Sequence, residues 1–380
     1  MSYRIAVVIK TDGLEFDDRV RKEILTIQKL YPDISFKIFA MLPDNREFEG
    51  VTSYGTPFKS LYIPAREKYG AAEKVLLKAF QFYRVVKKDL SEYDAVWAAD
   101  IESVFVPFLI KNKRMLWDLH ELPSQLMSGS LKKRLLRFVF SRCRIVLHAN
   151  PQRAEYLEKQ GVITNMKKHY SLRNYPNFAD VDKKYDDKYH SFITWKGDRR
   201  CVYLQGLDGD WRAAYESITS VMKISGIVAV VVGPFNQTIK EKLINEYEDE
   251  LEKRILFIGR IPQLKIPQYV KECFTTLVFY KNVSPNNYYC EANRFYQSVI
   301  MGLPVVVGNN PPMRDLVNSY GLGVSIDDDG NDINKIVAGL KEIIDNYSKY
   351  KIQNEKNRNK LVWDNQENTV KEIVNYLFID

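Results

Sequence analysis

Three polar residues fall on the opening turns of one expected helix, within Asn-Asn-Tyr-Tyr-Cys-Glu-Ala-Asn-Arg-Phe-Tyr-Gln at residues 286–297. Asn293 and Gln297 are four residues apart and so share a helix face, with Arg294 beside them. A helix N-terminus offers free N–H groups and a positive dipole end, and an arginine adds a cation that pairs with phosphate oxygens. The pattern suits a diphosphate; the alternative is a solvated polar face.

A second set of polar residues follows expected strands in the first half of the chain. Asp100 comes after a strand near 94–99, and His120 and Glu121 come after a strand near 114–119. Asp12, in the loop Thr11-Asp-Gly13, follows the first strand. Carboxylates at strand ends are candidate general bases, whereas a single histidine there is otherwise a structural residue. The first loop lacks GxGxxG, which argues against an NAD-type dinucleotide fold.

The elements that position these residues alternate between strands and helices. Residues 4–10 form a short apolar run, as expected for a strand buried on both faces of a parallel sheet. A helix capped by Asp17 or Asp18 and a strand near 34–40 complete one βαβ unit. The alternation continues with strands near 59–63, 94–99, 114–119 and 143–149 and helices near 71–89, 101–112, 131–142 and 151–160.

A second series of strands and helices begins after a stretch without periodicity. Its strands are expected near 201–205, 227–232, 255–259, 275–280, 303–307 and 323–326, and its helices near 211–223, 237–250, 265–273, 288–301, 311–318 and 331–346. We therefore expect a first domain over 1–178, a linker over 179–200, a second domain over 201–362 and a closing helix over 363–380. The fold class is α/β, with two tandem Rossmann-like doubly wound domains facing a cleft.

Composition limits the class of protein. The 380 residues are 45% hydrophobic and 27% charged, as in a folded soluble protein. The net charge of +8 is uneven: residues 1–200 hold 36 Lys and Arg against 25 Asp and Glu, or +11, and residues 201–380 hold 20 against 23, or −3. A basic first half attracts anionic partners such as nucleic acid, acidic lipid or phosphorylated substrates.

Location and metal content are also constrained by the sequence. The first residues do not resemble a secretory signal, and no apolar run approaches the roughly 20 residues that span a bilayer, so we expect a cytoplasmic protein. The four cysteines form no CxxC pair and the four histidines lack ligand spacing, so we expect reduced cysteines and no metal site.

One expected helix is strongly basic. Residues 130–144 place Leu131, Leu135 and Phe138 on one stripe and Lys132, Lys133, Arg134 and Arg137 around the rest. Such a helix suits an anionic membrane surface, where each basic residue contributes about 1 kcal/mol. The alternative is a helix that packs on the sheet and is solvated by its lysines.

The segment Asn-Arg-Phe-Tyr-Gln-Ser-Val-Ile-Met-Gly-Leu-Pro-Val-Val resembles the donor-binding motif of GT-B nucleotide-sugar glycosyltransferases, in the large retaining family of bacterial polysaccharide synthesis. The resemblance implies that Arg294 holds the diphosphate and that Gln297 lies where an acidic residue grips the ribose. Glu291 does not restore the usual two-glutamate spacing. The carbonyl of a glutamine side chain can still accept a hydrogen bond from the ribose diol, so we expect ribose binding to be weakened but retained.

The resemblance extends to other segments. Val231-Val-Gly233-Pro resembles a turn of the nucleotide site, Phe257-Ile-Gly-Arg260-Ile261-Pro resembles the segment that holds the base and approaches the phosphates, and Tyr203-Leu-Gln-Gly206 with Asp210 and Arg212 resembles the first turn of the donor domain. In the first half, the resemblance implies that His120 approaches the donor sugar and that Asp12 and Gly13 lie near it.

The implied activity is transfer of a sugar from a UDP- or GDP-sugar to a hydroxyl of a glycan or lipid-linked acceptor, with retention. Because Arg294, Arg260 or Arg212 and a helix N-terminus already provide positive charge, we expect no metal or other cofactor. The basic helix over 130–144 favours a place at the inner face of the membrane.

Should the enzyme invert, Asp12, Asp100 and Glu121 are the candidate bases. A non-catalytic subunit of the same fold and a sugar-nucleotide epimerase are the alternatives. We do not expect nucleic-acid binding, because the basic residues are not interleaved with aromatics along a binding element.

Overall fold

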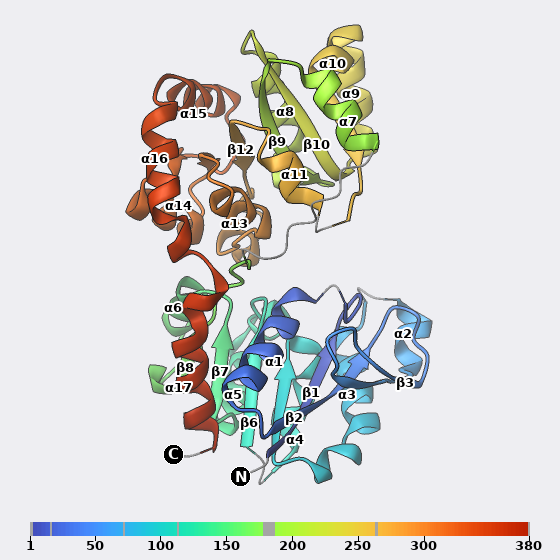
Figure 1. Cartoon of the computed structure of the whole chain (residues 1–380). Helices are drawn as coiled ribbons and strands as arrows, with labels where there is room; N and C mark the ends of the chain where they lie inside the picture. The colour runs from blue at the N-terminus through green and yellow to red at the C-terminus, as the bar shows by residue number, and fades with distance from the viewer. Residues whose placement is uncertain are drawn as a thin grey trace. The chain divides into compact units, whose positions relative to one another are not determined.

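The computed structural model describes residues 3–15, 17–70, 73–111, 114–177, 187–262 and 265–378. The chain divides into two compact units, one made of Met1–Asn174 with Gln366–Asp380 and the other of Tyr175–Asn365. Each unit is a sheet with helices packed on it (Figure 1). The chain therefore leaves the first unit near residue 174 and returns to it with its last helix.

The first unit has an eight-stranded sheet in the order β3-β4-β2-β1-β5-β6-β7-β8. All neighbouring strands are parallel except β3 and β4. The strands are β1 Tyr3–Lys10, β2 Ile34–Met41, β3 Phe48–Val51, β4 Pro57–Ser60, β5 Ala95–Ala99, β6 Arg114–Leu119, β7 Ile145–His148 and β8 His169–Ser171. Because β1, β5 and β6 are adjacent and parallel, their carboxyl ends lie at one edge of the sheet.

Helices cover both faces of this sheet. Ile5, Trp97, Leu116 and Leu147 point to one face, where they meet apolar residues of α1 (Asp18–Leu30) and α17 (Glu367–Phe378). Trp117 points to the other face and packs on Phe140 of α5. The remaining helices of this unit are α2 Pro64–Tyr69, α3 Val75–Val86, α4 Phe105–Leu109, α5 Ser130–Arg142 and α6 Pro151–Lys159.

The sequence explains where α1 begins and ends. Asp17 caps the helix, since its carboxylate accepts from Val20 N at 3.3 Å. Val20, Ile24 and Ile27 repeat at helical spacing and are buried. The helix ends at Leu30, where Tyr31 and Pro32 leave the helical conformation. The first βαβ unit therefore forms as its residue pattern predicts.

The second unit has a six-stranded parallel sheet in the order β11-β10-β9-β12-β13-β14. Its strands are β9 Arg200–Leu207, β10 Ile227–Phe235, β11 Ile255–Gly259, β12 Thr275–Val278, β13 Val305–Val307 and β14 Gly323–Ser325. Alternate residues of β9 enter two separate cores: Val202 and Leu204 pack with α8 and α15, and Cys201 and Tyr203 pack with α7 and α11. Both faces of the sheet are thus buried.

The helices of the second unit are α7 Asp187–Lys196, α8 Ala214–Met222, α9 Gln237–Tyr247, α10 Asp249–Arg254, α11 Ile266–Val270, α12 Pro285–Tyr288, α13 Asn293–Ile300, α14 Pro311–Tyr320, α15 Ile333–Asp345 and α16 Tyr347–Asn357. The fold class is the expected one, with two doubly wound α/β units.

Several boundaries differ from the sequence prediction. The expected linker 179–200 contains α7, which packs on the second sheet through Tyr189 and Phe192; its part before residue 187 lies outside the described residues. The helix expected over 288–301 is two helices, α12 and α13, so that Asn293 opens α13. The helix expected over 101–112 is shorter: one 3-10 turn at Ile101–Ser103 followed by α4. The C-terminal helix is part of the first unit.

No helix in the described ranges is long and apolar enough to cross a membrane. The helices α1, α5 and α15 have 13 residues each. At 1.5 Å per residue, each is about 20 Å long, which is less than the roughly 30 Å of a bilayer hydrocarbon core.

Candidate functional site

His120 lies between two carboxylates at the carboxyl edge of the first sheet. Its Nε2 is 2.9 Å from Asp118 Oδ2 and its Nδ1 is 3.3 Å from Asp100 Oδ2. Both ring nitrogens can donate only when the imidazole is protonated. Two carboxylates on a single ring therefore favour the imidazolium. Asp118 is on β6 itself, two residues before His120, while Asp100 follows the neighbouring strand β5.

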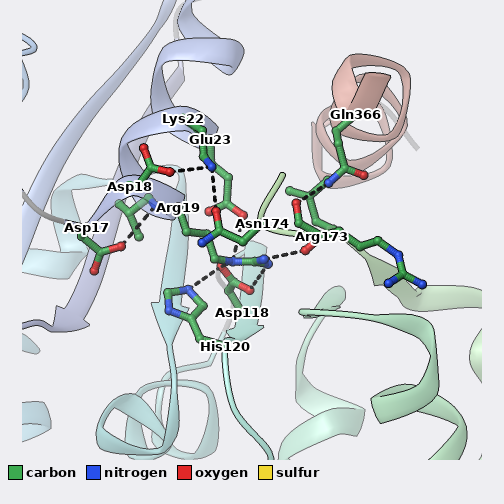
Figure 2. Close-up of polar contacts among 12 residues, drawn as sticks. Asp17, Asp18, Arg19, Lys22, Glu23, Asp118, His120, Arg173, Asn174 and Gln366 are labelled. Atoms are coloured by element: carbon green, nitrogen blue, oxygen red, sulfur yellow. Dashed lines mark hydrogen bonds and ion pairs between the residues drawn. The ribbon is translucent and has the colours of Figure 1, made fainter. Parts of the chain in front are cut away.

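Arg19 of α1 completes this group, which we call the His120 cluster (Arg19, Asp100, Asp118 and His120). Figure 2 labels Arg19, Asp118 and His120. Arg19 donates to both oxygens of Asp118, from Nε at 3.2 Å and from Nη2 at 2.8 Å, and donates from Nη1 to Leu172 O at 2.5 Å. Asp118 is 0% exposed and Arg19 5% exposed. A buried charge pair of this kind is costly to break.

The charges of the cluster follow from its geometry. Burial disfavours the imidazolium, but Asp100 and Asp118 outweigh burial and raise the pKa of His120 to about 10. Burial opposes ionisation of Asp118 as well, yet Arg19 and His120 together lower its pKa. Burial raises the pKa of Asp100 to about 6. Near pH 7, the cluster therefore holds two cations and two carboxylates, and His120 is a cation rather than a base.

Glu23 lies next to the cluster on α1, 1% exposed, with Oε1 3.2 Å from Arg19 Nε. Burial raises the pKa of Glu23 to about 8 even though Arg19 opposes the shift. Arg19 is already engaged by Asp118, so Glu23 is mainly protonated at neutral pH. Lys22, one residue earlier, donates to Asn174 Oδ1 at 2.7 Å (Figure 2).

Asp100 is held in an unusual backbone conformation. Its φ of 54° with ψ of −174° belongs to a region that residues other than glycine rarely adopt. Its Oδ1 accepts from His120 N at 2.8 Å and from Glu121 N at 3.2 Å. Two backbone hydrogen bonds thus fix this carboxylate, and its other oxygen lies 3.3 Å from His120 Nδ1.

The wild type should lose stability at alkaline pH as His120 loses its proton, and the His120→Gln variant should not show this loss. The folded pKa of His120 is raised from 6.5 to about 10, so its stabilising charge is fully present below pH 6.5 and is lost as pH rises through 10. The difference in unfolding free energy between wild type and variant should shrink by on the order of 3 kcal/mol over that window. Urea titrations from pH 6 to 10.5 measure it, and parallel stability curves would contradict a charged His120.

The other candidates of the first unit do not contribute a side chain to this cluster. The side chain of Glu121 is exposed. Asp12 lines a hollow of about 990 Å³ beyond the ends of β1, β2 and β4, and Gly13 follows it in the loop. The side chains that line the hollow include those of Asp12, Asp44, Asn45, Arg46, Glu47, Tyr62, Arg66 and Glu67. Groups of this kind can hydrogen-bond a hydroxyl-rich ligand.

In the second unit, two arginines converge on one tyrosine. Arg294 lies with its guanidinium carbon 5.0 Å from the Tyr280 ring centre, and Arg212 lies 5.9 Å from the same centre. Arg294 is 5% exposed and donates from Nη2 to Phe279 O at 3.2 Å. Arg212 also stacks on Trp211 at 4.3 Å. Arg212, which follows β9, and Arg294 of α13 thus meet beside Tyr280, which follows β12, and we call these two cations the arginine pair (Arg212 and Arg294).

One glycine makes room for Arg212, and a second glycine packs against the first. Gly206 has φ of 61°, its carbonyl accepts from Arg212 Nη1 at 2.5 Å, and a Cβ there would lie 2.8 Å from the same nitrogen. Gly233, with φ of 93°, approaches closely enough that its Cβ would lie 3.4 Å from Gly206 N. The ends of β9 and β10 therefore pack against each other without side chains.

The residues around Arg294 on α13 have separate surroundings. Asn293 is the first residue of the helix and is exposed. Gln297, one turn later, has a buried Oε1 without a hydrogen-bond partner in the described ranges. Glu291 accepts a hydrogen bond from the Tyr296 hydroxyl at 2.6 Å. Of these three residues, Gln297 is thus the one with a buried acceptor that lacks a partner among the described residues.

Arg260 and Ile261 follow β11, which is separated from β12 by β10 and β9. With strands about 4.8 Å apart, the ends of β11 and β12 lie roughly 14 Å from each other. Arg260 is exposed. The structure therefore brings Arg212 and Arg294 together and leaves Arg260 at the other side of the same sheet edge.

Solved structures share this architecture over the full length of the chain. A sucrose-phosphate synthase from Thermosynechococcus elongatus superposes with a TM-score of 0.78 at 14% identity, covering 99% of each chain. A glycosyltransferase from Rickettsia africae gives 0.72 at 12% identity, covering 100% of this chain and 99% of its own. HepE of Anabaena in complex with UDP-glucose gives 0.68 at 12% identity, covering 98% and 99%. This chain has the GT-B fold.

No protein-family model matches the GT-B chain described here, and no curated protein is similar to it in sequence. The identities of 12% to 14% establish the fold alone. What this GT-B protein does must therefore be argued from its own residues.

Several residues of these sites had no predicted role. Arg19, Asp118 and Tyr280 each fall within an expected helix or strand, but none of them was predicted to belong to a site. A signal was present for Asp118, because residues two apart on a strand point to the same face, as Asp118 and His120 do. No local signal marks Tyr280, whose importance lies in contacts with Arg212 and Arg294, 68 and 14 residues away along the chain.

Proposed function

We propose that this protein is a glycosyltransferase that moves a sugar from a nucleotide-diphosphate sugar to a hydroxyl of an acceptor. The observation that carries the proposal is the arginine pair: two largely buried guanidinium groups meet at Tyr280, at the carboxyl edge of a parallel sheet. Ligands of open α/β sheets bind beyond that edge. The GT-B fold, shared with a protein solved with UDP-glucose, supports the same assignment.

The arginine pair suits a leaving diphosphate. Departure of the nucleotide builds negative charge on its phosphates, and fixed cations stabilise that charge. Nε of Arg212 and Nε of Arg294 are buried and have no hydrogen-bond partner in the described ranges, so a bound anion can satisfy them. Arg294 is also the second residue of α13, where the helix dipole favours an anion. With two such cations, we propose a metal-independent reaction.

The donor is proposed to be a UDP- or GDP-sugar, and UDP is favoured by the solved GT-B proteins, which include complexes with UDP and UDP-glucose. Gln297, one turn after Arg294, presents the unsatisfied Oε1 that a ribose hydroxyl can satisfy. Glu291, Asn293, Gly233, Arg260 and Ile261 are proposed to complete the nucleotide site.

The Gln297→Glu variant should bind the donor nucleotide more tightly. A carboxylate accepts hydrogen bonds from a diol about twice as strongly as a neutral amide does, so affinity for UDP should rise roughly tenfold. The same substitution should leave affinity for inorganic pyrophosphate, which has no ribose, unchanged. Calorimetric titration of both ligands measures the effect. Equal affinity of variant and wild type for UDP would remove Gln297 from the ribose site.

The His120 cluster is proposed to support the sugar-transfer step. His120 is a cation fixed by two carboxylates and is thus suited to positioning the donor sugar and to electrostatic stabilisation. Asp100 is already hydrogen-bonded to two backbone N–H groups and paired with His120, so it is a poor general base. These constraints favour retention, in which the departing phosphate takes the acceptor proton. Glu121 and Asp12 remain the candidate bases for an inverting reaction.

The acceptor is proposed to be a glycan or lipid-linked sugar, in bacterial cell-surface polysaccharide synthesis on the cytoplasmic side of the membrane. The polar hollow beside Asp12 supports a hydroxyl-rich acceptor, since its tyrosine, amide and carboxylate groups can hydrogen-bond sugar hydroxyls.

The test is incubation with a panel of UDP- and GDP-sugars, with and without sugar acceptors, and measurement of released nucleoside diphosphate. Acceptor-dependent release supports transfer. Gln297 in place of an acidic residue favours one alternative, a non-catalytic subunit, which would bind a nucleotide and release nothing. Release of nucleoside diphosphate without any acceptor, together with a sugar whose configuration has changed at one ring carbon, would indicate an epimerase.

A further inference from the structure

Three helices of the first unit form one continuous surface. Phe80 of α3 packs edge-on against Phe105 of α4, and Phe108 of α4 packs edge-on against Phe138 of α5, each with 5.5 Å between ring centres. Arg142 at the end of α5 donates from Nη2 to Ile110 O, just after α4, at 3.0 Å. The helices therefore lie side by side, and we call their outward side the α3–α4–α5 surface (residues 74–88, 105–111 and 130–144).

This surface is strongly basic, and the acidic residues next to it in sequence, Glu73 and Asp89, lie directly outside its first segment. Its three segments hold five, one and six Lys and Arg, or 12 in all, and no Asp or Glu. The exposed basic side chains are Lys74, Arg84, Lys87, Lys88, Lys111, Lys132, Arg134 and Arg137. A solvated helix face in a protein of mixed charge normally carries both signs, so the exclusion of carboxylates from three adjacent helices points to an anionic partner.

The same surface exposes large apolar side chains among these charges. Leu131 is 78% exposed and Phe138 48% exposed, and the others are Leu77, Phe80, Val85 and Leu109. These six are nearly half of the 13 large apolar residues that are exposed in the described ranges. Surfaces that insert shallowly between lipid headgroups combine exposed leucine and phenylalanine side chains with lysine and arginine side chains in this way.

We propose that the α3–α4–α5 surface docks onto an anionic lipid bilayer, with its basic side chains at the phosphates and its apolar side chains among the upper acyl chains. Charge complementarity identifies an anion, and the apolar side chains distinguish a bilayer from nucleic acid. A nucleic acid offers bases for stacking but no hydrocarbon for Leu77, Leu109 and Leu131. Phe105 and Phe108, moreover, are already packed edge to face against other rings.

Sedimentation with vesicles tests this proposal independently of any transferase activity. The full chain should bind vesicles that contain about 30% phosphatidylglycerol and should not bind pure phosphatidylcholine at low salt. Raising the salt concentration should weaken binding, because surface charges are screened. The Lys132→Gln, Arg134→Gln, Arg137→Gln triple variant should bind the anionic vesicles roughly 100-fold more weakly.

Matched variants separate this surface from net charge. The triple variant Lys341→Gln, Lys349→Gln, Lys356→Gln removes three exposed charges from α15 and α16 and should bind vesicles as the wild type does. Leu131→Ser keeps every charge and should weaken binding roughly tenfold by removing an inserted side chain. The proposal would be overturned if both triple variants lost vesicle binding equally, or if Leu131→Ser bound vesicles as strongly as the wild type. Capture of single-stranded or duplex nucleic acid in place of vesicles would overturn it as well.

Discussion

The Arg294→Ala variant is expected to bind UDP about 100-fold more weakly than the wild type, which corresponds to roughly 3 kcal/mol for charged hydrogen bonds to a diphosphate. Arg294 is 5% exposed, contacts Tyr280 together with Arg212, and is the second residue of α13. A small side chain there removes the cation from the site, and alanine is well tolerated in a helix. Calorimetric titration of UDP measures the loss.

Two variants make this result specific. Arg314→Ala removes an arginine from α14, where it pairs with Asp315 on the surface, and should leave the UDP affinity unchanged. Arg294→Lys keeps the charge but not the planar fork, so its affinity should lie between those of wild type and Arg294→Ala. Thermal midpoints of all three variants establish that they are folded. A folded Arg294→Ala that binds UDP normally would place the diphosphate elsewhere.

The Asp118→Ala variant is expected to lower the free energy of unfolding by about 3 kcal/mol, because it leaves a buried Arg19 without its bidentate partner. Asp118 is 0% exposed and accepts from Arg19 and His120. Glu23, 3.2 Å from Arg19 Nε, can ionise in compensation, which limits the loss. Urea titration of the full chain measures the change.

A second substitution removes the carboxyl group of Glu23, which can otherwise compensate for the loss of Asp118. The double variant Asp118→Ala, Glu23→Gln should be less stable than Asp118→Ala, whereas Glu23→Gln alone should cost little near pH 7, where Glu23 is mainly protonated. Asp315→Ala breaks an ion pair of similar length, 2.9 Å, between half-exposed partners and should cost less than about 1 kcal/mol. If Asp118→Ala and Asp315→Ala cost the same, the His120 cluster contributes no more than a surface pair.

Local sequence patterns predicted most of the fold. β6 occupies the predicted residues 114–119, and α5 begins one residue before the predicted helix. Both elements could be predicted because a strand follows from a continuous apolar run and a helix from apolar residues at helical spacing. The helix α7 could not be predicted in this way. Tyr189 and Phe192 are its only buried residues, with Ile193 and Trp195 partly buried beside them, and its other residues are charged or polar, so its sequence resembles a linker.

The candidate sites were predicted only in part. Arg294 and Gln297 lie on one helix, so their proximity follows from their spacing. Arg19 and Asp118 are 99 residues apart, and they meet only because α1 packs on the sheet that carries β6. Arg212, which follows β9, and Arg294, which is on α13, likewise come from separate elements and meet only in the folded unit. Sequence spacing therefore identifies residues within an element, whereas pairs between elements require the sheet order.

The most direct test of the arginine pair is thermal unfolding of the wild type with uridine, UMP, UDP and GDP. A ligand at 100 times its dissociation constant adds about 2.7 kcal/mol of stability. Because two cations converge where the diphosphate is proposed to bind, UDP or GDP should raise the midpoint clearly, UMP should raise it much less, and uridine should have almost no effect. Equal shifts with UMP and UDP, or no shift with any nucleotide, would contradict the account.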